Sequence, residues 1–128
     1  MERVAIIGAS MTPFGQRDAW VRELLAEAGA AALDDAGIDG DDLDHLYVSN
    51  MASGEFEGQT GVPNALAHDL AATPAYTARI DQTSSSGGAG VYAAWQSVAS
   101  DVVRWVIFSP PTSSVTSLAP EATDCQAA

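Results

Sequence analysis

Lysine is absent from this sequence, and every basic residue is an arginine. The 128-residue chain has 5 arginines against 17 aspartate and glutamate residues, which gives a formal net charge of -12. A few scattered arginines cannot form a basic stripe along a phosphate backbone, so we expect no nucleic-acid partner. The acidic excess also argues against an anionic membrane surface. Asp39, Asp41, Asp42 and Asp44 form a cluster that is typical of a solvated surface.

Cysteine and long apolar runs are also scarce. The only cysteine, Cys125, cannot form an internal disulfide, and a reduced, cytoplasmic setting is our expectation. The first residues lack the basic and then apolar pattern of a signal peptide. No apolar stretch approaches the roughly 20 residues that span a bilayer, so we expect no membrane segment. Abundant alanine with many acids and no lysine predicts, on composition alone, a halophilic protein.

Short apolar runs alternate with helical patterns along the first hundred residues. Asp18 is a candidate N-cap for the first helix, and Gly37 is a candidate left-handed terminator. The alternation of strands and helices predicts an α/β fold with crossover helices. The predicted strands are residues 4–8, 45–48, 75–83 and 102–108, and the predicted helices are residues 18–37, residues 63–70 and a segment that includes residues 91–98.

Two segments depart from this alternation. Residues 49–61 hold three glycines among polar residues and predict a long ordered loop, a kind of segment that is often functional. From residue 109 onward, ten of the last twenty residues are Ser, Thr or Pro, and Pro110 and Pro111 interrupt any strand or helix. We therefore predict a domain over residues 1–108 and an irregular tail over residues 109–128.

Several familiar motifs are absent. The glycine after the first strand, Gly8, lacks the further glycines of a dinucleotide fingerprint, and the lack of lysine excludes a phosphate loop. His45 and His68 have no cysteine or acid at ligand spacing, so surface or packing roles are favoured and no metal site is predicted.

The informative segment is residues 81–88, which hold three consecutive serines followed by two glycines. In one interpretation a serine simply caps the helix that follows, which is common. In the other, a nucleophile stands at the helix N-terminus, where free backbone amides and the helix dipole favour developing negative charge. Local sequence alone favours the cap.

Taken together, four segments resemble the N-terminal part of a thiolase of the archaeal and sterol-carrier-protein-like branch. They are residues 4–15, residues 21–37, residues 48–59 and the serine-rich turn of residues 79–88. The resemblance implies a partial thiolase-type N-terminal domain with a mixed sheet. It also implies acyl transfer between coenzyme A thioesters, which are substrates, with no separate cofactor. Partners implied by the family are further copies of the same chain and a small subunit with an OB fold and a zinc ribbon.

In this resemblance, Ser84 occupies the position of the family's nucleophilic cysteine, while substrate-binding residues stay unassigned. A serine hydroxyl needs a strong, positioned base, whereas a thiol at a helix N-terminus ionises readily. The family pattern fades near residue 100, and Arg104 interrupts an expected buried strand. The family's remaining catalytic positions have no counterpart here. We therefore expect either a thiolase-like acyltransferase whose chain is incomplete or an inactive, truncated homologue, which is an assembly module or a frameshift product.

Overall fold

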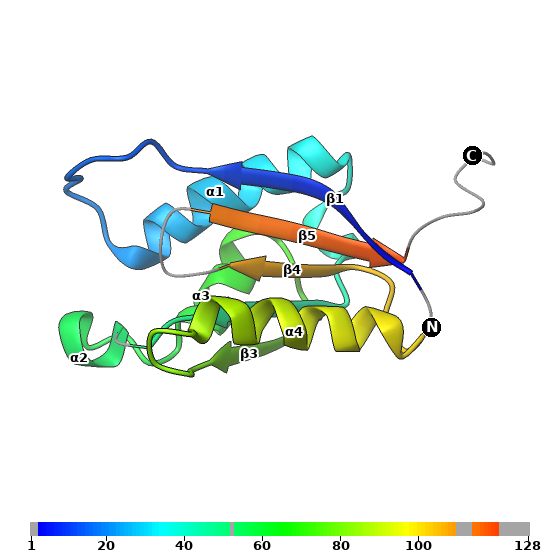
Figure 1. Cartoon of the computed structure of the whole chain (residues 1–128). Coiled ribbons are helices and arrows are strands. Elements are labelled where there is room, and N and C mark those ends of the chain that lie inside the picture. Colours follow the sequence, from blue (N-terminus) through cyan, green and yellow to red (C-terminus); the bar gives the residue numbers. More distant parts are fainter. Residues whose placement is uncertain (1–2, 52, 110–113, 121–128) are drawn as a thin grey trace.

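The computed structural model describes residues 3–51, 53–109 and 114–120. Its centre is a five-stranded sheet in the order β1-β5-β4-β2-β3 (Figure 1). Strands β2, β3 and β4 are parallel, whereas β5 runs antiparallel to both of its neighbours, so the sheet is mixed as expected. The strands are β1 (Val4–Met11), β2 (His45–Ser49), β3 (Tyr76–Ile80), β4 (Val106–Ser109) and β5 (Ser114–Pro120).

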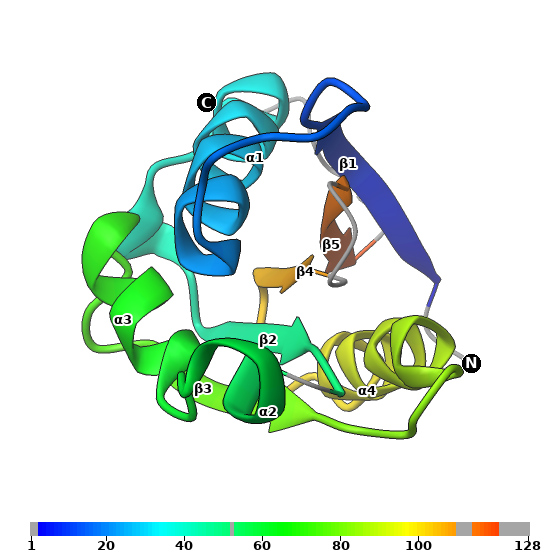
Figure 2. The same cartoon turned by 90° about the vertical axis from the view of Figure 1, so that its left-hand side faces the viewer.

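Helices cover both faces of this sheet. Among the described residues, the helices are α1 (Val21–Ala36), α2 (Ser53–Glu57), α3 (Val62–Asp69) and α4 (Ser86–Ala99), with one 3-10 turn, η1 (Gly40–Asp42). α1 and α3 pack on one face, and α4 packs on the other (Figure 2). The alternation in β2 follows from strand geometry, because Leu46 and Val48 point to α1 and α3 while Tyr47 points to α4.

The first helix ends where the sequence predicts but begins later. Gly37 terminates α1 in the left-handed conformation, with φ of 68°, as expected. Asp18 is not the N-cap, because Trp20 holds that position and its backbone N–H donates to the Glu23 carboxylate at 2.8 Å. α1 lies very close to β1, since a Cβ on Gly8 would lie 2.5 Å from the backbone oxygen of Ala32. Glycine is therefore required at this contact.

The parallel strands are joined by the crossover helices that the sequence predicts. α3 connects β2 to β3, and α4 connects β3 to β4. Ser49 at the end of β2 pairs with Ile80 at the end of β3, so the segments that follow these two strands leave the same edge of the sheet. This edge is the place where ligands bind in open α/β sheets.

Two predicted irregular segments need correction. Residues 49–61 are not all loop, because Ser53–Glu57 form α2. Ser114–Pro120, expected to be irregular, form β5 between β1 and β4, which would otherwise both present unpaired strand edges. Pro110 and Pro111, on which the irregular tail was argued, lie outside the described residues, as do residues 121–128.

Arg104 does not interrupt a buried strand. β4 begins at Val106, and Arg104 lies before it in an exposed position. The backbone N–H groups of Arg104 and Trp105 donate to the Asp44 carboxylate at 2.8 Å and 3.0 Å, and the guanidinium lies 5.2 Å from the Trp105 ring centre. The guanidinium charge of Arg104 therefore stays in solvent, beside the ring of Trp105.

Candidate active site

The serine-rich segment forms a tight turn between β3 and α4. Ser84 is exposed in this turn and precedes the helix by two residues, because α4 begins at Ser86 and Ser85 is its N-cap. The sequence places Ser84 at the helix N-terminus, and the structure puts it immediately outside the first helical turn. The N-terminal amides of a helix lack intrahelical acceptors, and those that the turn itself does not engage can face an anion beside Ser84.

Backbone geometry in the turn is unusual at Thr83. Its φ of 49° lies in the left-handed region, which a β-branched residue rarely adopts. Its carbonyl oxygen accepts the Ser86 backbone N–H at 3.1 Å and the Ser86 hydroxyl at 2.7 Å. Strained backbone of this kind persists where surrounding contacts hold it and is concentrated at functional sites.

A cavity of about 360 Å³ opens beside this turn. Its walls come from the start of α1, the segment between β2 and α2, α2 itself and the serine turn, so the fold assembles it from segments that are far apart in sequence. Most of the lining is apolar. The lining residues are Val21, Asn50, Met51, Ser53, Phe56, Glu57, Thr83, Ser84, Ser86 and Gly87.

The wall formed by residues 50–51 and 53–57 is anchored to the rest of the domain at both ends. At one end the Asn50 backbone N–H donates to the Ile80 carbonyl at 3.1 Å, and the Asn50 side-chain oxygen accepts the Ser53 N–H at 2.8 Å. At the other end the Glu57 carboxylate accepts the Val21 N–H at 3.2 Å and 3.3 Å. A carboxylate at the N-terminus of α1 is favoured by the helix dipole.

Two buried hydroxyls near this edge lack hydrogen bonds. Within the described parts of the chain, the Ser49 and Ser53 side-chain oxygens have no partner, although the two residues are 0% and 2% exposed. Buried polar groups normally find a partner, so the carboxyl edge of the sheet is incompletely satisfied. Phe56, by contrast, is 84% exposed at the rim of the cavity.

Comparison with known proteins shows which family the chain belongs to. The family model described as "Thiolase, N-terminal domain" matches residues 4–109. The chain belongs to the thiolase family. Acetyl-CoA acetyltransferases of Methanothermobacter thermautotrophicus and Methanocaldococcus jannaschii are each 39% identical to it over 101 residues, which are 78% of this chain and 26% of each relative. The chain thus spans about a quarter of the length of these curated relatives.

A solved structure supports the thiolase-type fold. The priming β-ketosynthase of the R1128 polyketide pathway superimposes with a TM-score of 0.78 at 15% identity, and the match covers 94% of this chain and 51% of that one. At this identity the likeness concerns the fold alone. The family match continues to residue 109, so the expectation that the family pattern fades near residue 100 is wrong.

Neither histidine of this thiolase-family chain lies at the serine turn. His45 starts β2 and pairs with Tyr76 at the start of β3, whereas Ser84 follows the end of β3. His68 lies in the last turn of α3, which runs back from the carboxyl edge toward the amino edge. Burial lowers the pKa of His45, and the nearby Asp44 opposes that effect. Sequence reasoning gave both histidines no catalytic role, and this stays a prediction.

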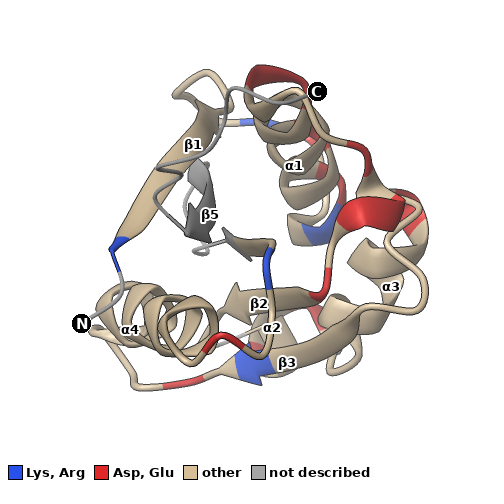
Figure 3. Ribbon diagram, turned by 90° about the vertical axis from the view of Figure 1, so that its right-hand side faces the viewer, with Lys and Arg blue, Asp and Glu red and all other residues tan. Residues whose placement is uncertain are grey.

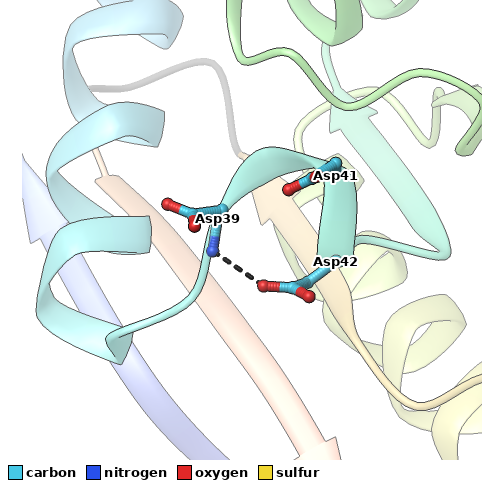
Figure 4. Close-up of side chains that lie close together, drawn as sticks. All are labelled: Asp39, Asp41 and Asp42. Carbon is cyan, nitrogen blue, oxygen red and sulfur yellow. Dashed lines mark hydrogen bonds between the residues drawn. The ribbon is translucent and has the colours of Figure 1, made fainter.

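The acidic cluster lies away from the serine turn as well. Asp39, Asp41 and Asp42 have carboxylate oxygens within 4.8 Å of one another, and all three residues are exposed (Figure 4). The Asp42 carboxylate accepts the backbone N–H of Asp39 at 3.0 Å.

Acidic segments extend over α1 and this turn, and the arginines are few and separated (Figure 3). Arg17 and Arg22 form ion pairs with Glu27 and Asp69, which lowers the pKa of both carboxyls.

Sequence reasoning missed the contributions of Val21, Glu57 and Ser86 to this site. It singled out residues 48–59 through the family resemblance but assigned no atom there. The glycine-rich composition of residues 49–61 was the available signal for the cavity wall. No sequence signal links Glu57 to the start of α1, because that contact joins residues 36 positions apart.

Proposed function

We propose that this chain supplies the nucleophile-bearing part of a thiolase-type acyl-CoA C-acyltransferase, with Ser84 as the acyl acceptor. The position of Ser84 carries the proposal, since it is exposed, lines an apolar cavity and precedes the N-terminus of α4. The similarity to acetyl-CoA acetyltransferases supports coenzyme A thioesters as the substrates. No separate cofactor enters this proposal.

The first half-reaction transfers the acyl group to the chain. The Ser84 oxygen bonds to the thioester carbonyl carbon, the hydroxyl proton passes to a base, and the carbon–sulfur bond breaks as coenzyme A leaves and takes up a proton. The first amides of α4 stabilise the oxyanion that forms on the carbonyl oxygen. In the second half-reaction, a base takes the α-proton of another acyl-CoA, and the resulting carbanion attacks the carbonyl carbon of the Ser84 ester. The bond between this carbon and the Ser84 oxygen breaks, the proton passes to that oxygen and restores the hydroxyl, and the product is a β-ketoacyl-CoA.

In the described part of this chain, no histidine supplies the base for these steps. Within that part, His45 and His68 lie toward the opposite edge of the sheet from Ser84. A serine hydroxyl is a weak nucleophile without an adjacent base. We therefore expect the isolated chain to turn over little or no substrate, even though it carries the acyl acceptor.

Intact-mass analysis after incubation with excess acetyl-CoA tests the assignment of Ser84. The parent chain, here carrying Cys125→Ser so that its own thiol cannot react, is expected to gain slowly a single acetyl group that Ser84→Ala does not gain. Ser84→Cys should be acylated faster, because a thiolate is the better nucleophile. Ser85→Ala is the matched control, since it removes the neighbouring hydroxyl, which does not line the cavity. Absence of label on both the parent chain and Ser84→Cys would contradict the proposal.

An assembly role is a second candidate, and exposed apolar side chains favour it. Tyr92 and Val91 on α4 and Tyr76 on the edge strand β3 are 58%, 46% and 58% exposed. Val91 and Tyr92 are adjacent on α4, and exposed apolar side chains that lie next to one another are typical of interaction surfaces. We propose further copies of this chain, or a small OB-fold and zinc-ribbon subunit, as partners. Light scattering after size-exclusion chromatography tests self-association, and a monomer at all concentrations would exclude it.

The setting of the protein stays a prediction. None of the described helices is both long and apolar enough to cross a membrane. The absence of lysine and the net charge of -12 support the proposed halophilic, cytoplasmic protein.

A further inference from the structure

The Ser86 side chain closes the turn that carries Ser84. Ser86 is the first residue of α4 and is 2% exposed. Its hydroxyl donates to the Thr83 carbonyl at 2.7 Å and accepts the Gln82 backbone N–H at 2.8 Å. One buried hydroxyl therefore joins the first turn of the helix to the two backbone groups that lead into Ser84.

The neighbouring serine makes a weaker connection. The Ser85 hydroxyl donates to the Gln82 carbonyl at 2.8 Å, but Ser85 is exposed. Water can replace an exposed hydroxyl, whereas removal of a buried hydroxyl leaves the Gln82 N–H without that acceptor. The two adjacent serines thus differ in burial while they share the same turn.

The contacts of Ser86 also hold an unfavourable backbone conformation. Thr83 has a φ of 49°, and both the N–H and the hydroxyl of Ser86 bond to its carbonyl. Loss of the hydroxyl removes the shorter of these two bonds. Thr83 is then free to relax toward negative φ, which moves the Ser84 side chain relative to the N-terminus of α4.

We propose that Ser86 is a positioning residue, whose hydroxyl holds the Ser84 side chain at the N-terminus of α4. This proposal rests on the proposed function, in which Ser84 accepts the acyl group. Ser86 itself forms no bond with the substrate. Because Ser86 holds the Ser84 side chain in place, the helix dipole and the first amides of α4 can act on the reacting oxygen.

The test uses a thiol as a reporter at position 84. In the full chain, Ser84→Cys combined with Cys125→Ser leaves a single thiol, and its rate of alkylation by iodoacetamide is measured from pH 5.5 to 10. A thiol at a helix N-terminus has a pKa below the ordinary value of about 8.5. Adding Ser86→Ala should raise this apparent pKa and lower the rate at pH 7 by about threefold, as expected for loss of one helix-dipole interaction.

Ser85→Ala in the same background is the matched control and should leave the pH profile unchanged. If Ser86→Ala and Ser85→Ala give the same profile while circular dichroism shows both folded, the proposal is overturned. If Ser86→Ala does not fold, Ser86→Thr, which keeps the hydroxyl, replaces it. An unchanged profile in Ser86→Thr then supports the proposal, and a raised pKa overturns it.

Alkylation needs neither coenzyme A thioesters nor a second protein. A failure of Ser86→Ala to change the profile therefore leaves acyl transfer to Ser84 untouched. Absence of acetylation at Ser84, with a normal alkylation profile, removes only the proposed function.

Discussion

The two edges of the parallel strands β2 and β3 are built differently. At the amino edge, the Tyr47 hydroxyl lies 3.0 Å from His45 Nδ1 and 2.8 Å from the Ser97 hydroxyl, which itself donates to the Ala93 carbonyl at 3.0 Å. The rings of His45 and Tyr76 pack 5.1 Å apart beside this network. Sequential hydrogen bonds thus join the sheet to the C-terminal part of α4.

The carboxyl edge has the opposite character. It holds a cavity, a strained Thr83 and, among the described residues, two buried hydroxyls without partners. Satisfied networks make a fold rigid, whereas unsatisfied groups and strain lower its stability and are concentrated at sites of function. We therefore expect the amino edge to contribute more to stability, while the carboxyl edge carries the proposed chemistry.

The largest expected effect comes from breaking the amino edge. Tyr47→Ala removes a ring that is 7% exposed and packs with Ala94 and Val98, so we expect a loss of about 3–5 kcal/mol in the free energy of unfolding, similar to other buried aromatic truncations. Urea unfolding followed by circular dichroism measures it. Tyr47→Phe keeps the ring and should cost only about 1 kcal/mol.

Tyr47→Phe also checks whether the two edges are independent. In the thiol-reporter background its alkylation profile at position 84 should match that of the parent. A shift as large as that of Ser86→Ala would show that the amino edge also controls the serine turn.

A substitution at the carboxyl edge should act in the opposite direction. Thr83→Asn replaces a β-branched residue at φ of 49° with one that tolerates this conformation, so we expect a gain of about 0.5–1 kcal/mol in the free energy of unfolding. The same urea titration measures it. Ala71→Asn, at φ of 53°, is the matched control and should give a similar gain. A loss of stability on Thr83→Asn alone would show that the threonine side chain stabilises the turn.

The smallest expected effect is a pH dependence at the amino edge. Burial lowers the pKa of His45 in the folded chain, so above the ordinary value of about 6.5 the ring is neutral in both states. As the pH falls below that value, the unfolded chain binds the proton first, and stability decreases until the folded-state pKa is passed. The urea concentration at the midpoint of unfolding should therefore decrease as the pH is lowered from 7.5 to 5. His45→Gln should reduce this dependence, and an unchanged slope would contradict the assignment.

Much of the fold could be predicted from local patterns. The apolar runs and helical spacing placed the strands and crossover helices within a few residues of their observed bounds, and Gly37 marked the end of α1 correctly. β5 could not be predicted from composition. A segment rich in Ser and Thr has little apolar pattern of its own, and its strand conformation depends on the open edges of β1 and β4.

The candidate site divides in the same way. The sequence by itself determined a nucleophile-type serine turn ahead of a helix, because the strand, serines, glycines and helical spacing are local. Only the tertiary structure decided that Glu57 holds α2 against α1, that Met51 and Phe56 form a wall beside Ser84, and that Ser86 rather than Ser85 is the buried serine. These relations depend on how distant segments pack against one another. The sequence pattern cannot tell which of two adjacent serine hydroxyls is buried, because burial depends on that packing.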